Sequence, residues 1–171
     1  MGWPDSVIWW HCYPLRFVDA EREAIDHVEH RLWRLTNWLD YVVELGANGP
    51  LLAPVFASRT HGYDTLDHYR IDPRLGDDAD VDDLIWKAKE RGIRVLLDGV
   101  FNHVSDRHEI VRRALADGPD SEAGRWIRWV DGYPRGFEGN LDLVELDLAH
   151  PPVQDYVVGV MNHWLDRGVD G

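Results

Sequence analysis

Two short clusters of polar residues carry side chains that could do chemistry. In the first, a carboxylate, an amide and an imidazole follow one another closely, in the order Asp98-Gly99-Val100-Phe101-Asn102-His103. Asp98 and His103 are residue types that act as acid and base, or that hydrogen-bond a polar ligand. The same types also cap strand ends by satisfying the backbone of the following loop. On spacing alone, both interpretations stay open.

The second cluster lies between His61 and Pro73 and begins with Tyr63 and Asp64. An aromatic face beside carboxylates suits a sugar ring, which offers an apolar C–H face and a rim of hydroxyls. The alternative is a surface turn, because Asp-Pro pairs such as Asp72-Pro73 mark turns. No His/Cys spacing resembles a zinc site, and no glycine-rich phosphate loop is present.

The elements that must hold these clusters follow a repeated layout of helix, glycine and short apolar strand. The spacing of apolar residues predicts helices over 32–45, from a cap at Asp80 to 91, and over 151–167, with glycines ending each one. Strands are expected at 7–11, 50–53 and 94–100, and another begins at Val169. Strands alternating with helices favour βαβ units and a parallel sheet. The polar clusters would then lie at the carboxyl ends of strands, where such sheets bind ligands.

This layout predicts an α/β fold, the first half of a (β/α)8 TIM barrel with strands 1–3 and the start of strand 4. A complete barrel takes about 250 residues, and the chain stops at Gly171, in the fourth strand. We expect one truncated domain: residues 1–103 with strands 1–3 and helices 1–2, an insertion over 104–140, and helix 3 with the start of strand 4 over 141–171. A complete four-stranded α/β domain is the alternative.

The tryptophans divide into two groups by position. Trp126 and Trp129 lie in the insertion and are candidate ligand platforms, because aromatic residues in loops often bind ligands. The others of interest lie in helical patterns and are expected in the core, where aromatic side chains contribute much buried area: Trp33, Trp38, Trp86 and Trp164.

Charge and composition exclude several partners. With 18 basic and 31 acidic residues the formal charge is −13, which disfavours nucleic acid and anionic membrane surfaces. A single cysteine, Cys12, allows no internal disulfide. No targeting segment or membrane span is visible, so we expect a soluble, cytoplasmic protein.

Taken together, the segments resemble the α-amylase superfamily of glycoside hydrolases. Asp98 to His103 resembles the superfamily's first signature, Asp-x-x-x-Asn-His, at the end of the third barrel strand. Tyr63 to Asp67, with Ile71-Asp72-Pro73, resembles the segment after the second strand in the cyclomaltodextrinase and neopullulanase branch. Two further stretches are similar to the end of the inserted domain B and to the lead-in to the second signature: Leu143–Asp147 and Trp164–Gly171.

The resemblance implies a retaining enzyme that acts on α-linked glucans or maltooligosaccharides. Such enzymes use a nucleophile and an acid/base carboxylate about 5–5.5 Å apart. Tyr63 would stack under the sugar, His103 would hydrogen-bond its hydroxymethyl group, and Asp98 would hold the polar network. Asp64 would add a subsite contact. Asn102 would brace the loop or, in some members, ligate calcium, and no cofactor is otherwise required.

The family's catalytic carboxylates are expected beyond Gly171, so these residues would carry substrate contacts without the catalytic pair. Two alternatives are compatible with these residues. One is a barrel relative without catalysis that acts as a binding or transporter-associated subunit. The other is an unrelated α/β barrel enzyme in which Asp98 and His103 act as acid and base.

Overall fold

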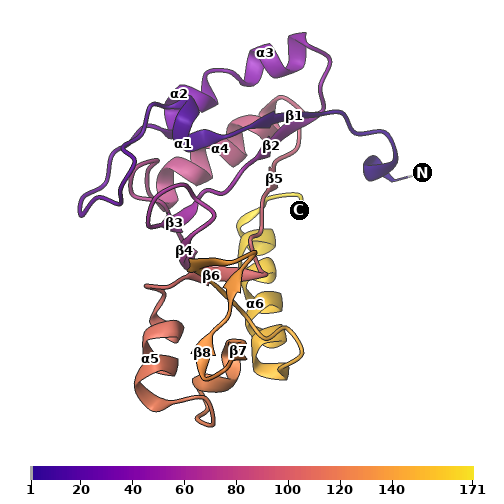
Figure 1. The fold of residues 1–171 in the computed structure, drawn as a ribbon. Helices are drawn as coiled ribbons and strands as arrows, with labels where there is room; N and C mark the ends of the chain where they lie inside the picture. Colours follow the sequence, from indigo (N-terminus) through magenta and orange to yellow (C-terminus); the bar gives the residue numbers. More distant parts are fainter. Residues whose placement is uncertain (1) are drawn as a thin grey trace.

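The computed structural model describes residues 2–171, which form two lobes connected by a long C-terminal helix (Figure 1). The upper lobe contains a parallel three-stranded sheet in the order β1-β2-β5. Its strands are β1 (Trp9–Cys12), β2 (Gly49–Leu52) and β5 (Leu96–Leu97). The predicted parallel α/β arrangement is therefore present in this lobe.

The third sheet strand is shorter than the predicted 94–100. Pairing continues at both ends of β5, since Arg94 N donates to Asn48 O and Asp98 N donates to Leu52 O. After β5 the chain leaves the sheet and runs toward β6 in the lower lobe (Figure 1). The close approach of β2 to this segment requires glycine at position 49, because a Cβ there would overlap the Arg94 carbonyl.

Helices α1 (Pro14–Phe17), α2 (Leu32–Thr36), α3 (Leu39–Glu44) and α4 (Asp78–Glu90) belong to the upper lobe. The single helix predicted over 32–45 is interrupted, and the prediction is wrong there. Trp38 N donates to Leu35 O, three residues back, so the chain tightens into a 3₁₀-like turn between α2 and α3.

The start of α4 also differs from the prediction. Asp77, not Asp80, is the N-cap, because its carboxylate accepts hydrogen bonds from Ala79 N and Asp80 N. Asp80 is the third helical residue, and its carboxylate accepts in return from Asp77 N at 2.9 Å. The two aspartates thus form a reciprocal capping box.

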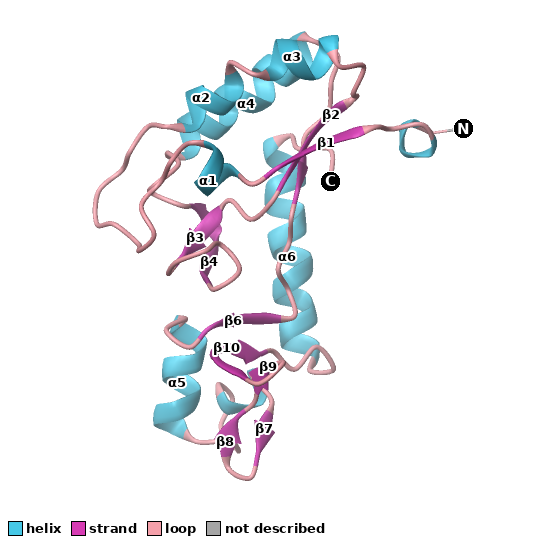
Figure 2. Ribbon diagram, turned by 45° about the horizontal axis from the view of Figure 1, so that its top comes forward, coloured by secondary structure: helices cyan, strands magenta, loops and turns pink. Residues whose placement is uncertain are grey.

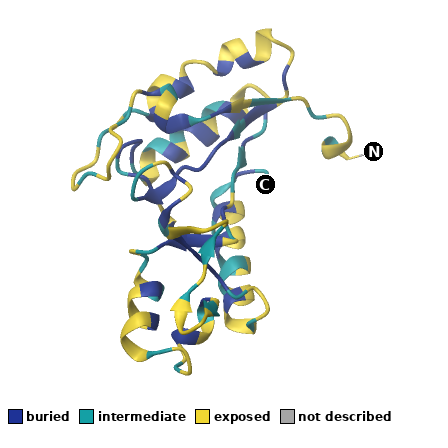
Figure 3. Ribbon diagram, in the orientation of Figure 1, coloured by how far each residue is buried: buried dark blue, intermediate teal, exposed yellow. Residues whose placement is uncertain are grey.

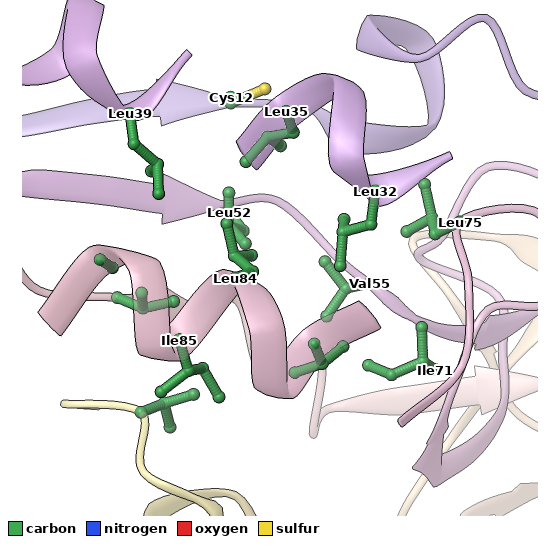
Figure 4. Packing of buried hydrophobic residues seen from close by; sticks show 14 of the residues in the cluster. Cys12, Leu32, Leu35, Leu39, Leu52, Val55, Ile71, Leu75, Leu84 and Ile85 are labelled. Atoms are coloured by element: carbon green, nitrogen blue, oxygen red, sulfur yellow. The ribbon is translucent and has the colours of Figure 1, made fainter. Parts of the chain in front are cut away.

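The upper core lies between the sheet and the helices, and its aliphatic side chains interdigitate (Figure 4). Leu35 and Leu39 approach from the α2–α3 side, Leu84 and Ile85 from α4, and Leu52 from the sheet. Burying such side chains contributes about 1.5–3 kcal/mol each. The buried faces of these elements and the exposed outer faces of the helices are seen in Figure 3.

Of the four tryptophans expected in the core, only Trp164 is buried, at 3% exposure. Trp33, Trp38 and Trp86 are 53%, 44% and 57% exposed, so the expectation is wrong for them. The aliphatic residues at spacings of three and four occupy the inner helix faces, which leaves these indoles on the outside. The Trp38 ring instead stacks nearly parallel to the ring of Trp10.

An antiparallel ribbon connects the sheet with the lower lobe. It consists of β3 (Phe56–Ser58) and β4 (Thr65–Ile71), whose intervening loop, residues 59–64, carries the start of the second polar cluster. His68 of β4 is fully buried: one ring nitrogen contacts the Val100 carbonyl at 2.8 Å and the other contacts Tyr156 Oη at 3.0 Å.

The lower lobe has its own sheet and its own core (Figure 2). Strands β6 (His103–Ser105), β10 (Asn140–Glu145) and β9 (Gly136–Phe137) are antiparallel, in that order. The divisions expected at 103/104 and 140/141 pass through this sheet. The remaining elements of the lobe are α5 (Glu109–Asp117), η2 (Gly124–Trp126), β7 (Trp129–Val130) and β8 (Tyr133–Pro134).

Helix α6 (Pro151–Arg167) runs along both lobes and begins and ends where predicted. Gly168 ends it with φ of +114°, a left-handed conformation that favours glycine. The last residues then lie beside β5, because Asp170 N donates to Val95 O and Leu97 N donates to Gly171 O. No helix within residues 2–171 is long and apolar enough to cross a membrane.

The partly buried imidazole of His108 makes the stability depend on pH. His108 is the N-cap of α5, where its Nδ1 accepts from Ile110 N, and burial lowers the pKa of its imidazole to about 4, with neighbouring His68 adding to the shift. The unfolded chain takes up this proton near pH 6.5. The contribution of neutral His108 to the free energy of unfolding should therefore be fully present above pH 6.5. It should be lost as the pH falls toward 4, by on the order of 2 kcal/mol.

Urea unfolding at pH 7.0 and 4.5 measures this loss. The His108→Asn variant keeps a capping side chain that does not titrate, so its stability should fall less over the same interval. An equal fall in both proteins would contradict the assignment.

Candidate functional site

The two polar clusters of the sequence meet in the structure through His103. Its Nε2 donates a hydrogen bond to the backbone carbonyl of Tyr63, 3.0 Å away, across 40 residues of sequence. The His103 ring is 6% exposed and stacks on Phe137 of β9, with centroids 4.6 Å apart. Its Nδ1 is buried and has no hydrogen-bond partner within residues 2–171. The first residue of β6 thereby holds the loop that carries Tyr63.

Asp98 lies at the carboxyl end of β5 and is electrostatically coupled to both neighbouring segments. Burial raises the pKa of the Asp98 carboxyl, and His11 at the end of β1 opposes that rise. Burial also raises the pKa of the Tyr63 phenol, and the negative charge of Asp98 adds to the effect. Burial lowers the pKa of the His103 imidazole. At neutral pH the site thus combines a neutral imidazole, a phenol and a half-buried carboxyl.

Tyr63 has the exposure expected of a residue that contacts a ligand. Its side chain is 39% exposed, although its backbone is held by His103. Gly62 precedes it with φ of +91°, and a Cβ there would press against Pro54. A glycine is therefore needed for the turn that presents the Tyr63 ring.

Asp64 has a different environment from the one predicted for a sugar contact. It is 3% exposed, and its two carboxylate oxygens accept from Thr60 N at 3.1 Å and Thr60 Oγ1 at 2.6 Å. Both oxygens are thus used inside the 59–64 loop, where they stabilise the turn. A sugar contact by Asp64 stays a prediction.

Asn102 is exposed at the entry to β6, and its backbone carbonyl accepts from Leu146 N at 3.0 Å. The nearest buried carboxylate on the paired strand is Glu145, which Arg135 neutralises at 3.3 Å. Within residues 2–171, the only close group of three His, Cys, Asp or Glu ligand atoms is His30, Asp77 and Asp80, at the start of α4. Calcium binding by Asn102 stays a prediction.

Trp126 and Trp129 are partly buried and pack against the lower core. Trp126 contacts Tyr156 edge-on, and Trp129 Nε1 donates to Gly124 O at 2.8 Å. Trp129 also lines a cavity of about 620 Å³. Both indoles thus have packing contacts in the structure, and their role as ligand platforms stays a prediction.

Phe137, Thr60 and Arg74 take part in this site but were not predicted from the sequence. Phe137 reaches His103 from a hairpin, a tertiary contact without a sequence signal. Thr60 donates to Asp64 within the 59–64 loop, and Arg74, paired with buried Asp72, donates to the Thr60 carbonyl. The one signal in the sequence was the Asp72-Pro73 turn pair, which directly precedes Arg74.

Fold and site together define an α/β protein with a polar, aromatic-lined site formed by the carboxyl end of β5, the β3–β4 loop and the start of β6. Residues 11–141 match the family model for the α-amylase catalytic domain, and the chain belongs to that family. The predicted resemblance is thereby confirmed.

Individual relatives agree with this assignment. The chain is 30% identical to an intracellular maltogenic amylase of Bacillus subtilis, over 99% of this chain and 32% of that protein. It is also 30% identical to a cyclomaltodextrinase of Geobacillus thermopakistaniensis, over 99% of this chain and 33% of that protein. The chain thus spans about a third of the length of these curated relatives.

Solved structures show the same fold. The cyclic α-maltosyl-(1→6)-maltose hydrolase of Arthrobacter globiformis, in complex with maltose, superposes with a TM-score of 0.84 at 29% identity. The superposition covers 96% of this chain and 43% of that one.

Proposed function

We propose that these residues supply the sugar-contacting, N-terminal part of a retaining glycoside hydrolase that acts on α-linked glucans or maltooligosaccharides. The observation that carries the proposal is the hydrogen bond from His103 to the loop of Tyr63, close to Asp98 at the carboxyl end of β5. Tyr63 and His103 are joined by a hydrogen bond, and Tyr63 and Asp98 interact through charge. The relatives named for maltogenic amylase and cyclomaltodextrinase activity support the substrate class.

Each residue has a role that its environment suits. The exposed ring of Tyr63 stacks against the apolar face of a glucose unit. Asp98 accepts hydrogen bonds from sugar hydroxyls. The neutral His103 donates from Nε2 to the oxygen of a hydroxymethyl group, which takes the place of the Tyr63 carbonyl as acceptor. Asp64 acts chiefly by stabilising the loop of Tyr63, since both of its oxygens are already bound there.

The proposal extends to architecture and location. The parallel β1-β2-β5 sheet, with residues 170–171 alongside β5, suits the first half of a (β/α)8 barrel, and the lower lobe suits an insertion after the third strand. The cytoplasmic location remains a proposal, supported by the relative named as intracellular. The proposed reaction needs no organic cofactor.

The polypeptide of residues 1–171 alone should not hydrolyse maltooligosaccharides, because the retaining reaction requires two carboxylates about 5–5.5 Å apart on either side of the scissile bond. The proposal assigns neither role to Asp98 or any other residue here. Release of reducing sugar from maltoheptaose is the assay, and the protein at its natural length is the positive control.

The outcomes separate the candidate functions. Turnover at natural length that is lost in Tyr63→Ala supports the proposal. Sugar binding without turnover at natural length would favour the non-catalytic binding subunit instead. Turnover by residues 1–171 that disappears in Asp98→Asn would make Asp98 a catalytic carboxylate and contradict the assigned roles.

A further inference from the structure

A fully buried ion pair lies beneath the loop that carries Tyr63. Arg74 and Asp72 both have 0% exposure. Arg74 Nε and Nη2 donate to the two carboxylate oxygens of Asp72, at 2.8 and 2.6 Å, and Nη2 also donates to Ser58 Oγ at 2.7 Å. This bidentate geometry fixes the orientation of the guanidinium plane.

The remaining nitrogen of Arg74 holds the backbone of two separate loops. Nη1 donates to the carbonyl of Thr60 at 2.6 Å and to the carbonyls of Glu21 and Arg22, each at 3.1 Å. Residues 21–22 and 60–61 lie on a shared cavity of about 330 Å³. A single guanidinium therefore fixes both segments that border this cavity.

Thr60 extends the contact from Arg74 to the candidate site. Its carbonyl accepts from Arg74, while its amide and hydroxyl donate to Asp64. Asp64 directly follows Tyr63, whose own carbonyl accepts from His103. Hydrogen bonds thus run from the buried guanidinium to both ends of the turn that presents the Tyr63 ring.

The choice of residues is informative because a buried ion pair is a weak source of stability. The cost of removing the two charges from water offsets much of their attraction, so a pair of apolar side chains would often stabilise the core equally well. The planar guanidinium has five N–H donors in a fixed arrangement, whereas a lysine has only three on a flexible stem. Only arginine can bind Asp72 and both loops at once.

We propose that Arg74 is a positioning residue for the glucan-contacting loop, acting through Thr60 and Asp64 to set the place of the Tyr63 ring. The inference rests on the proposed function of that loop. It assigns no contact between Arg74 and substrate.

The test compares Thr60→Val with Thr60→Ser in the protein at its natural length. Valine keeps the shape of threonine but lacks the hydroxyl that binds Asp64, and serine restores that hydroxyl. Thr60→Val should raise the KM for maltoheptaose about tenfold with little change in kcat, because a hydrogen bond to a charged group is lost. Thr60→Ser should return the KM to within about twofold of the wild-type value, and Arg74→Lys should raise it at least as much as Thr60→Val.

A control separates positioning from general destabilisation. Leu84→Ala removes a core side chain of α4 that is 1% exposed and has no part in the site. Amide hydrogen exchange of residues 59–64 is measured in every variant, without substrate. Positioning predicts faster exchange there in Thr60→Val and Arg74→Lys, but not in Leu84→Ala.

Three results would each overturn the inference. They are an unchanged KM in Thr60→Val and Arg74→Lys, unchanged amide hydrogen exchange of residues 59–64 in those variants, or an equal rise in KM in Leu84→Ala. If the wild-type protein neither binds nor cleaves glucans, the proposed function fails. The exchange data then still decide whether Arg74 and Thr60 hold the loop.

Discussion

Asp72→Asn should lower the free energy of unfolding by about 3–5 kcal/mol, a large share of the total for an ordinary domain. The substitution hardly changes shape, but it leaves the Arg74 guanidinium without a counter-charge in a fully buried position. Equilibrium unfolding in urea, with an unchanged dependence on denaturant, measures the loss.

Asp40→Asn is the matched control, because it makes the same change in an ion pair on the surface. Asp40 accepts from Arg91 Nε at 2.6 Å, and its side chain is 72% exposed. Exposed pairs contribute at most about 1 kcal/mol. If Asp72→Asn were no more costly than Asp40→Asn, the buried pair would not hold the ribbon and loop in place.

His103→Ala should reduce kcat/KM for maltooligosaccharides by an amount that corresponds to about 2–4 kcal/mol, in the protein at its natural length. Two effects act together: the variant loses the donor proposed for the sugar hydroxymethyl group, and it releases the Tyr63 carbonyl. Binding of an unreactive sugar should weaken much less, because the hydrogen bond strengthens in the transition state.

The alternative is that His103 only braces the loop, in which case its loss lowers the melting temperature and spares turnover per folded molecule. Val104→Ala provides the comparison, since Val104 is the next residue of β6 and is fully buried in the lower core. An unchanged kcat/KM in His103→Ala, with a melting temperature like that of Val104→Ala, would remove His103 from the site.

The sequence predicted those parts of the fold that depend on local pattern. The glycine that ends α6 and the apolar faces of α4 and α6 follow from spacing and backbone conformation. The interruption at Trp38 and the exposed positions of Trp33 and Trp86 were not predictable in this way, because the choice of which helix face is buried depends on the partner it packs against.

The same division applies to the site. Tyr63, Asp98 and His103 were proposed from residue type and from the family resemblance. The structure joins His103 to Tyr63 by a hydrogen bond and lets the charge of Asp98 act on Tyr63, while their contacts with sugar stay a prediction. The inward orientation of Asp64 was missed, because it depends on the hydroxyl of Thr60 and on the buried guanidinium beneath it. Phe137 was missed because its contact with His103 depends on how β9 pairs with β10.

Helix α6 belongs to both hydrophobic cores, with Val153 in the lower one and Val160 and Trp164 in the upper one. Trp164 Nε1 also donates to the carbonyl of His68 in the connecting ribbon. Neither lobe can therefore lose its packing while the other keeps a complete core. We therefore expect the two lobes to unfold as one cooperative unit, so that a destabilising change in the lower lobe also affects the strand that precedes Asp98 and the loop that carries Tyr63.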